Sequence, residues 1–368
     1  MTESLKKVTL KGFKSIESLV DFDLKQLNVL IGANGAGKSN FVEFFRLLRA
    51  MADESFQKFV TERGGADGFF YLGPKHTPRI STRLEFGLNA YEFDLSVTAT
   101  SQMMINEELT QYKKSRQTIS VGRLESILRS IKDQKSPRYP QSFGVPHHIY
   151  ASISSWIVYH FHDTSLLAPM RRDQSVRDRT ALRQDASNIA AFLLHLRENY
   201  KGSYDLIRDT IRLIAPFFDD FLLEPENKGE EEKVRLEWRQ KGSDYPFQAY
   251  QLSDGTIRFI CLATALLQPV PPATIVIDEP ELGLHPFAIG LLASIIQSAS
   301  ERMQVIISTQ SPALLDMFKP DEIVVVNRQL GRSTFDRLNE KELQEWLNEY
   351  SVAELWQKNV LKGGPVND

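Results

Sequence analysis

A short run of glycines, a lysine and a serine carries the clearest chemistry in this sequence of 368 residues. The pattern GxxxxGK[ST] is filled by Gly32, Gly35, Gly37, Lys38 and Ser39. Glycines let a loop wrap closely round an anion, and a helix that starts near Lys38 adds its free N–H groups. The Lys38 ammonium would reach the β- and γ-phosphates of a nucleotide, and the Ser39 hydroxyl would ligate Mg²⁺. The sequence therefore predicts a nucleotide-binding loop; the alternative is an ordinary glycine-rich turn.

Two carboxylates follow an apolar stretch at 273–278. Asp278 stands at the tip of this predicted strand and can hold Mg²⁺ directly or through water. Glu279 points elsewhere and could polarise the water that attacks a γ-phosphate, which is the division of labour that an ATPase needs. An acidic turn that merely closes a strand is the alternative. The glycine-rich loop favours the catalytic interpretation.

Polar residues also stand at two further element ends. Ser253 and Gly255 open a predicted helix, where they could bind phosphate, although Ser253 could simply be an N-cap. Another buried strand ends near Thr309. Ligands of open parallel sheets lie beyond the carboxyl ends of the strands. We therefore expect the strand tips at Gly32, Asp278 and Thr309 to converge on one site.

The elements that must position these residues follow from the apolar periodicity. In the N-terminal part, one long helix is predicted over 38–51, and strands are predicted over 5–10, 19–22, 27–31, 79–88 and 91–98. In the middle part, helices are predicted over 186–197 and 204–215, and strands over 155–162, 217–223, 234–238 and 247–250. The last third alternates helix and strand, over 254–267, 273–278, 286–299, 304–308, 312–317 and 322–326. Such alternation predicts a parallel sheet flanked by helices, followed by a helical tail over 341–357 and a flexible segment at 362–365.

Two stretches are rich in Lys and Arg. Residues 111–140 hold eight basic residues against two acids, with a predicted helix over 124–131. A second basic run comprises Arg171, Arg172, Arg177, Arg179 and Arg183. These runs are either solvated surface or a basic face for nucleic acid or an acidic partner. The net charge of −3 gives no support to nucleic acid as a partner of the whole chain. The acidic loop at 224–232 is predicted to be a solvated turn.

Composition predicts a cytoplasmic protein without a membrane partner. The single cysteine, Cys261, excludes disulfides within the chain and fits a reducing compartment. No apolar run approaches the roughly 20 residues that span a bilayer, and the N-terminus lacks the apolar core of a signal peptide.

Together these motifs resemble the ABC-type ATPase heads of the SMC/RecF/OLD group. Residues 11–15 (KGFKS) resemble the opening motif of the group, 32–40 its Walker A, 252–256 its signature motif, and 275–286 its Walker B and D-loop. The resemblance runs over nearly the whole chain. It is closest to the stand-alone, RecF-like predicted AAA ATPases, which lack a Toprim domain and long coiled coils.

The resemblance implies an α/β fold of the P-loop NTPase type, with a mixed, largely parallel core sheet flanked by helices, an N-terminal antiparallel β subdomain and a helical insertion. One head would comprise lobe I (1–110), a basic, helical insertion (111–215), lobe II (216–340) and a C-terminal helical tail (341–368). The residues that would bind ATP from the same copy are Gly32, Ala33, Asn34, Gly35, Ala36, Gly37, Lys38, Ser39 and Asn40.

The resemblance also implies a head-to-tail homodimer. Each ATP would lie between Walker A of one copy and the signature motif of the other, so that Ser253 and Gly255 act in trans. Asp254 departs from the glycine that is common in this motif, and His285 stands at the position of the D-loop aspartate. Gln310 occupies the position of the switch histidine and could orient water, but it cannot gain charge near neutral pH. Turnover is therefore expected to be slow.

Other contacts of the nucleotide are predicted from the same resemblance. The strand end near Asp163 is the candidate for the Q-loop residue. Two segments, Lys14–Ser15 and Gly64–Gly73, are the candidates for adenine contacts.

The leading hypothesis is an ATPase whose ATP-gated dimer acts on DNA or controls a nuclease or toxin partner, in DNA repair or anti-phage defence. One alternative is an ATP-bound regulatory switch with little hydrolysis. Another is an ATP-dependent nuclease of the OLD kind, but too few residues follow Val326 for the acidic metal-binding domain that it needs. The KGFKS opening and the Asp-Gly-Thr signature argue against a third alternative, a transporter subunit.

Overall fold

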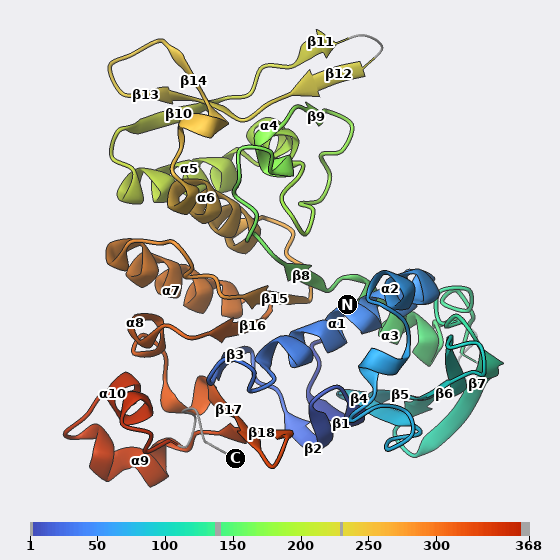
Figure 1. The fold of residues 1–368 in the computed structure, drawn as a ribbon. Helices are drawn as coiled ribbons and strands as arrows, with labels where there is room; N and C mark the ends of the chain where they lie inside the picture. The colour runs from blue at the N-terminus through green and yellow to red at the C-terminus, as the bar shows by residue number, and fades with distance from the viewer. Residues whose placement is uncertain (1–2, 137–140, 229–230, 362–368) are drawn as a thin grey trace.

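Two β-sheets pack on opposite sides of one long helix, as the ribbon in Figure 1 shows. The computed structural model describes residues 3–136, 141–228 and 231–361. The predicted flexible segment at 362–365 and Arg138 of the first basic run lie outside the described residues.

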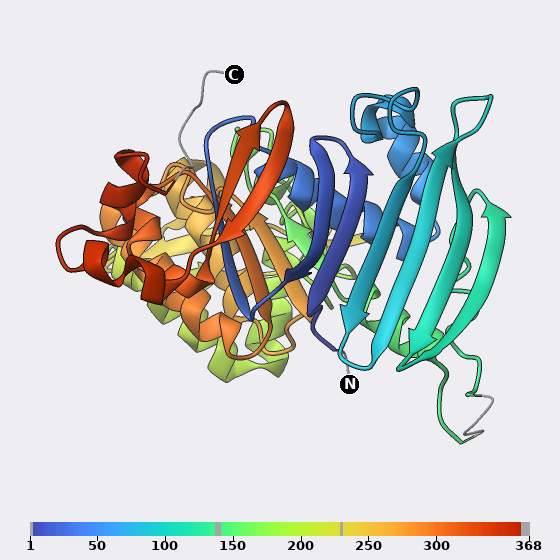
Figure 2. The same cartoon turned by 90° about the horizontal axis from the view of Figure 1, so that it is seen from below.

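The N-terminal sheet is antiparallel and runs in the order β2-β1-β4-β5-β6-β7 (Figure 2). Its strands are β1 (Lys7–Phe13), β2 (Ile16–Asp23), β4 (Ile80–Phe86), β5 (Asn89–Val97), β6 (Met103–Tyr112) and β7 (Ser115–Arg123). Buried and partly exposed residues alternate along β4, because successive side chains of a strand point to opposite faces. The predicted N-terminal antiparallel β subdomain is confirmed.

The second sheet runs in the order β18-β17-β3-β16-β15-β8. Its strands are β3 (Leu27–Ile31), β8 (Ile157–Tyr159), β15 (Thr274–Asp278), β16 (Gln304–Thr309), β17 (Ile323–Gln329) and β18 (Arg332–Arg337). The strands from β17 to β8 are parallel, and β18 adds an antiparallel edge. Every residue of β3 and β16 is buried, as expected of parallel strands that are covered on both faces.

Alternation along these buried strands divides the interior into two cores. Leu30, Val276 and Ile306 face the side of α1 (Lys38–Ala52), which fills the space between the two sheets with apolar residues such as Phe41 and Phe44. Neighbouring residues such as Val29 lie in the other core, under the helices of the opposite face.

The remaining helices cover the two cores. They are α2 (Phe56–Glu62), α3 (Val145–Ser154), α4 (Ile189–Asn199), α5 (Lys201–Ile214), α6 (Asp254–Leu267), α7 (Pro286–Ser300), α8 (Pro312–Leu315), α9 (Glu340–Leu347) and α10 (Val352–Gln357). The short 3-10 helices are η1 (Asp67–Phe69), η2 (Pro169–Arg171), η3 (Ala249–Gln251) and η4 (Pro320–Glu322). Two small sheets are formed by β9 (Gln174–Ser175), which precedes α4, and by strands that follow α5: β10 (Phe218–Leu222), β11 (Glu226–Lys228), β12 (Glu231–Val234), β13 (Glu237–Gln240) and β14 (Pro246–Gln248). Figure 1 shows α4, α5 and α6 between these strands and the parallel sheet.

The start of the predicted insertion differs from expectation. Residues 111–123 are not helical, because they complete β6 and form β7 at the edge of the N-terminal sheet. The helix predicted over 124–131 is wrong, and turns replace it. The cause is the buried carboxylate of Glu108, which accepts hydrogen bonds from the Ser126 hydroxyl and from the backbone N–H of Ile127. These bonds hold the segment against β6.

Three smaller expectations are also corrected. The strands predicted over 79–88 and 91–98 would leave a turn at residues 89–90, but the turn lies at Gly87–Leu88, where Gly87 has a positive φ of 61°. Part of the acidic loop pairs as β11 with β12. The tail forms two helices because Ser351 caps a new one, α10.

Within the described residues, no helix is both long and apolar enough to cross a membrane.

Candidate nucleotide site

The glycine-rich loop joins β3 to α1 and lies tightly against the edge strands of the sheet. A Cβ atom added at Gly32 would come within 2.0 Å of the carbonyl oxygen of Val326 on β17. At Gly37, where φ is 117°, it would come within 2.1 Å of the Ser333 hydroxyl on β18. These two positions therefore require glycine.

Lys38 opens α1 and turns back into the loop. Its side chain is only 5% exposed, and Nζ donates to the carbonyl oxygens of Gly32 at 2.6 Å and Ala33 at 3.2 Å. Burial lowers the pKa of Lys38, whereas the charges of Glu279 and Asp278 raise it. No side chain among the described residues caps the helix, so the N–H groups of its first turn are available to an anion.

The rest of the loop and its neighbours lie around this point. Ser39 is exposed in the first turn of α1, as are Asn34 and Gly35 in the loop. Asn40 donates from Nδ2 to the Ser15 hydroxyl at 2.7 Å, and Ser333 donates to the same oxygen at 2.7 Å. This bonding ties the KGFKS segment to the loop.

Asp278 and Glu279 stand at the tip of β15, one strand away from β16 and two from β3. Asp278 pairs in register with Ser308 and accepts a hydrogen bond from its hydroxyl. Glu279 has a positive φ of 45°, an uncommon conformation for a residue with a side chain. This backbone turn brings Oε1 of Glu279 to 2.6 Å from Nε2 of Gln310.

The strand tips predicted to converge therefore do lie along one edge. The parallel order β3-β16-β15 places the loop, Thr309 and Asp278 at the carboxyl ends of adjacent strands. There the Gln310 amide contacts the Glu279 carboxylate, and the charge of Glu279 opposes the burial that lowers the pKa of Lys38.

The signature segment lies elsewhere in the same copy. Ser253 is the N-cap of α6 and accepts from the backbone N–H of Thr256 at 3.1 Å. Gly255 packs so closely on the D-loop that an added Cβ would lie 2.4 Å from the carbonyl oxygen of Gly283. Between described residues, no hydrogen bond or ion pair joins 253–256 to the loop at 32–40.

The two other motif positions are occupied as follows. His285 is the N-cap of α7, and its Nδ1 accepts from the backbone N–H of Phe287 at 3.3 Å. Asp163 is exposed and accepts from the backbone N–H of Ser165 at 3.0 Å. Partial burial lowers the pKa of the neighbouring His162, and the charges of Asp278 and Glu279 in the site oppose this shift.

The segment at 64–73, a candidate for adenine contacts, packs on β1. The backbone N–H of Lys14 donates to the carbonyl of Phe69 at 2.8 Å, and that of Tyr71 donates to the carbonyl of Gly12 at 2.9 Å. Both candidate segments therefore lie side by side. Their contacts with adenine stay a prediction.

Sequence reasoning missed three side chains around the site. Glu281 was part of a recognised motif without a role, and its carboxylate contacts Thr309 and Gln310. Arg258 donates to the carbonyls of Phe161, His162 and Leu282. Arg171 was interpreted as part of a basic run, yet its side chain is only 4% exposed and pairs with Asp254 at 2.9 Å. Of these three residues, only Glu281 left a signal in the sequence, because it closes the acidic segment Asp278–Glu281.

Several other basic residues of the two runs are ion-paired. Arg116 pairs with Glu92, and Arg129 with Glu54. In the second run, pairs join Arg179 to Glu198 and Arg183 to Asp178. These pairs reduce the net positive charge that the runs present.

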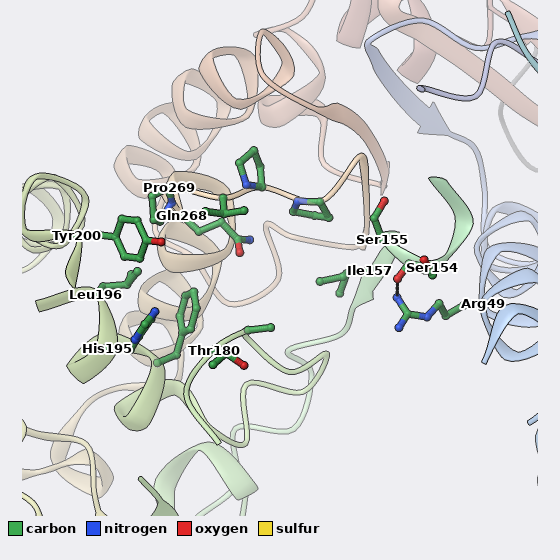
Figure 3. Close-up of a pocket in the computed structure, with 15 residues that line it drawn as sticks. Arg49, Ser154, Ser155, Ile157, Thr180, His195, Leu196, Tyr200, Gln268 and Pro269 are labelled. Atoms are coloured by element: carbon green, nitrogen blue, oxygen red, sulfur yellow. Dashed lines mark hydrogen bonds between the residues drawn. The ribbon is translucent and has the colours of Figure 1, made fainter. Parts of the chain in front are cut away.

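A cavity of about 340 Å³ lies at the opposite edge of the parallel sheet (Figure 3). It is lined by residues that precede β8 and β15, such as Ser155 and Gln268, and by His195 of α4. Arg49 at its wall is already bonded to the carbonyls of Ser154 and Trp156. Eleven residues of helix separate Arg49 from Lys38, about 16 Å along the axis. The cavity is therefore not the nucleotide site.

Fold and loop together define an α/β P-loop protein with a head of the ABC/SMC type. The chain belongs to the family described as "AAA domain, putative AbiEii toxin, Type IV TA system", whose model matches residues 27–316. The predicted resemblance and fold class are thereby confirmed.

Solved structures agree on the fold. An Smc head bound to the C-winged helix domain of ScpA is 13% identical, with a TM-score of 0.59 over 93% of this chain and 99% of that one. A Pyrococcus furiosus Smc head with an extended coiled coil, bound to the C-terminal domain of ScpA, is 14% identical, with a TM-score of 0.56 over 95% of this chain and 99% of that one. The chain has no match among curated proteins.

Proposed function

We propose that this protein binds ATP with Mg²⁺ and hydrolyses it to ADP and phosphate. The observation that carries the proposal is the 2.6 Å contact between Gln310 Nε2 and Glu279 Oε1, beside the lysine of the glycine-rich loop. A carboxylate oriented by an amide at this position is suited to act as the base for an attacking water.

The oxygen donors near the strand tips fit Mg²⁺. Asp278 is held by the Ser308 hydroxyl, and the Ser39 hydroxyl is exposed at the start of α1. Mg²⁺ prefers oxygen ligands and keeps several waters, so that two protein oxygens suffice. Asp278 and Ser39 would hold the ion, which would neutralise charge on the phosphates.

The loop residues 32–40 would cradle the phosphates. Lys38 now donates to the carbonyls of Gly32 and Ala33, and it would exchange these partners for phosphate oxygens. An ammonium that is already buried beside the loop needs little further desolvation to bind an anion. Glu279 would accept the proton of the attacking water, and Gln310 would orient that water.

A second copy of the chain would complete the site. Ser253 and Gly255 would reach the ATP of the partner, as the resemblance to ABC-type heads implies. Their separation from the loop of their own copy supports this arrangement, because both halves carry exposed groups suited to phosphate.

The ATP-gated dimer would control a partner protein of the nuclease or toxin kind, in anti-phage defence or DNA repair. The family description, which names a toxin of a type IV system, supports an effector role. Both similar Smc heads are bound to a domain of ScpA, which supports binding of a partner protein. DNA is the other candidate partner, and the ion pairs of the basic runs favour it less.

A regulatory switch with little hydrolysis is the second candidate function. Gln310 favours it, because a glutamine cannot take up a proton as a switch histidine can. Nothing favours a nuclease within this chain: among the described residues, no group of three or more His, Cys, Asp or Glu is arranged to hold a metal ion.

Phosphate release and molecular mass in solution test the proposal, compared for wild type and Glu279→Gln with ATP and Mg²⁺. We expect wild type to turn over, and Glu279→Gln to lose at least about 100-fold in rate and to stay an ATP-bound dimer. Glu62→Gln, on the exposed end of α2, is the matched control. Equally low phosphate release in both proteins would favour the switch, and a variant that stays monomeric with ATP would refute the dimer.

A further inference from the structure

A third carboxylate, Glu281, lies beside the two that the proposed mechanism uses. It follows β15 within the turn that leads to α7. Its Oε1 atom accepts from the Thr309 hydroxyl at 2.6 Å and from the backbone N–H of Gln310 at 3.2 Å. Its Oε2 atom is buried and has no hydrogen-bond partner among the described residues. A buried polar atom without a partner is costly, so this residue needs an explanation.

The contacts of Glu281 fix a short segment at the end of β16. Thr309 is fully buried and pairs in register with Ile31, just before the glycine-rich loop. Its hydroxyl donates to Glu281 and accepts from the backbone N–H of Ser311 at 2.9 Å. The carboxylate therefore holds residues 309–311 through both a side chain and the main chain.

This segment carries the group that touches the proposed base. Gln310 is held by Glu281 at its backbone N–H, and its side chain reaches Glu279 Oε1 at 2.6 Å. A glutamine side chain has three rotatable bonds, so its amide is placed well only when its backbone is fixed. The buried carboxyl supplies that fixation without facing solvent.

We propose that Glu281 is the positioning residue of the switch segment, which aims the Gln310 amide at the Glu279 carboxylate. It acts on the rate of hydrolysis and not on nucleotide affinity. The inference rests on the proposed ATPase function. Burial raises the pKa of Glu281, and hydrogen bonds from Thr309 and Gln310 oppose this shift.

The test compares Glu281→Ala with Glu281→Gln, by kcat, KM and the Kd of a fluorescent ATP analogue. We expect Glu281→Ala to lower kcat about 100-fold, because the base and its amide are misplaced, while Kd changes less than about threefold. Glu281→Gln keeps an acceptor oxygen for Thr309 and Gln310, so it should restore kcat to within about threefold of wild type. Glu301→Ala, on an exposed helix end, is the matched control.

A double variant separates positioning from simple support of the fold. If Glu281 acts through Gln310, then Gln310→Ala should lower kcat in wild type but not further in Glu281→Ala. Thr309→Val should lower kcat about tenfold without removing the carboxyl, which keeps the test open if Glu281→Ala fails to fold. Additive losses, or a Kd that rises as much as kcat falls, would overturn the inference and leave the ATPase proposal standing. A wild type that never releases phosphate would overturn both.

Discussion

The two halves of the proposed ATP site are built in different ways. The loop half depends on the main chain: buried parallel strands bring β3, β16 and β15 together, and the backbone of β17 and β18 closes on Gly32 and Gly37. The signature half depends on two arginine side chains that bridge distant segments. Arg171 binds the carbonyls of Thr164, Ala249 and Leu252 as well as Asp254.

Arg258 completes the second half from within α6. It is 6% exposed and donates to the Phe161 carbonyl at 2.9 Å, to the His162 carbonyl at 3.2 Å and to the Leu282 carbonyl of the D-loop. The signature helix is thus tied to the end of β8 and to the segment after Asp278. A movement at the strand tip that carries Asp278, the proposed metal ligand, would therefore be passed through Arg258 to the face that would meet the partner copy.

The two halves should therefore respond differently to the loss of a single side chain. Main-chain packing should keep the fold and the nucleotide affinity of the loop half insensitive to most single side chains other than those that touch phosphate. The signature half can be loosened by removing one guanidinium.

Lys38→Ala should strongly weaken nucleotide binding with little effect on the fold. The ammonium contributes hydrogen bonds between charged groups, which are worth up to about 3 kcal/mol, so affinity should fall about 100-fold. Titration with a fluorescent ATP analogue measures this effect. Lys58→Ala is the control, because Lys58 is exposed on α2 and pairs only loosely with Glu62, at 3.9 Å. Retained binding by Lys38→Ala would mean that the loop does not hold the phosphates.

Arg258→Met should destabilise the protein by about 3 kcal/mol, because one buried and two partly buried hydrogen bonds to carbonyl groups are lost. Urea unfolding, followed by circular dichroism, measures the change. Arg332→Met is the matched control, since Arg332 is 49% exposed and its pair with Glu17 should contribute only about 0–1 kcal/mol. Equal losses in both variants would show that the link from α6 to the D-loop is unimportant for stability.

The same contrast explains what the sequence could predict. The loop and the two carboxylates of Walker B are local patterns, in which a few neighbouring residues specify the backbone and the chemistry. The alternation of helices and strands likewise predicted the parallel sheet, with α6 at its observed bounds, Asp254–Leu267.

Contacts between distant parts of the chain could not be predicted. Arg171 lies 83 residues from Asp254, and Arg258 lies 97 residues from Phe161. A run of arginines therefore looked like a charged surface, although one member is buried at the signature. The Glu108 carboxylate misled in the same way, because its bonds to Ser126 and Ile127 override a local helical pattern.

Arg171→Met should weaken ATP-dependent dimerisation about tenfold, while the isolated chain still binds nucleotide. Asp254 is 68% exposed and its charge is neutralised by Arg171. Without the guanidinium, that carboxylate would repel the triphosphate of a partner copy. The measurement is light scattering in the Glu279→Gln background.

Adding Asp254→Asn to Arg171→Met should restore much of the lost dimerisation, because it removes the uncompensated charge. A double variant as weak as Arg171→Met would instead assign the effect to the lost carbonyl contacts of Arg171, and would limit the contrast between the two halves to structure.

Duplex DNA should have the smallest effect, changing the ATPase rate less than about twofold at low salt. A protein cation that contacts a DNA phosphate gains most of its binding free energy because it releases a counterion from the DNA. An arginine that is already paired to a carboxylate contributes less to this release. Arg116, Arg179 and Arg183 are paired in this way. The measurement is phosphate release with and without duplex DNA over a series of salt concentrations. A strong, salt-dependent stimulation would show that DNA, and not a partner protein, is what the dimer acts on. Arg116→Ala would then reduce the stimulation more than the control Arg332→Ala.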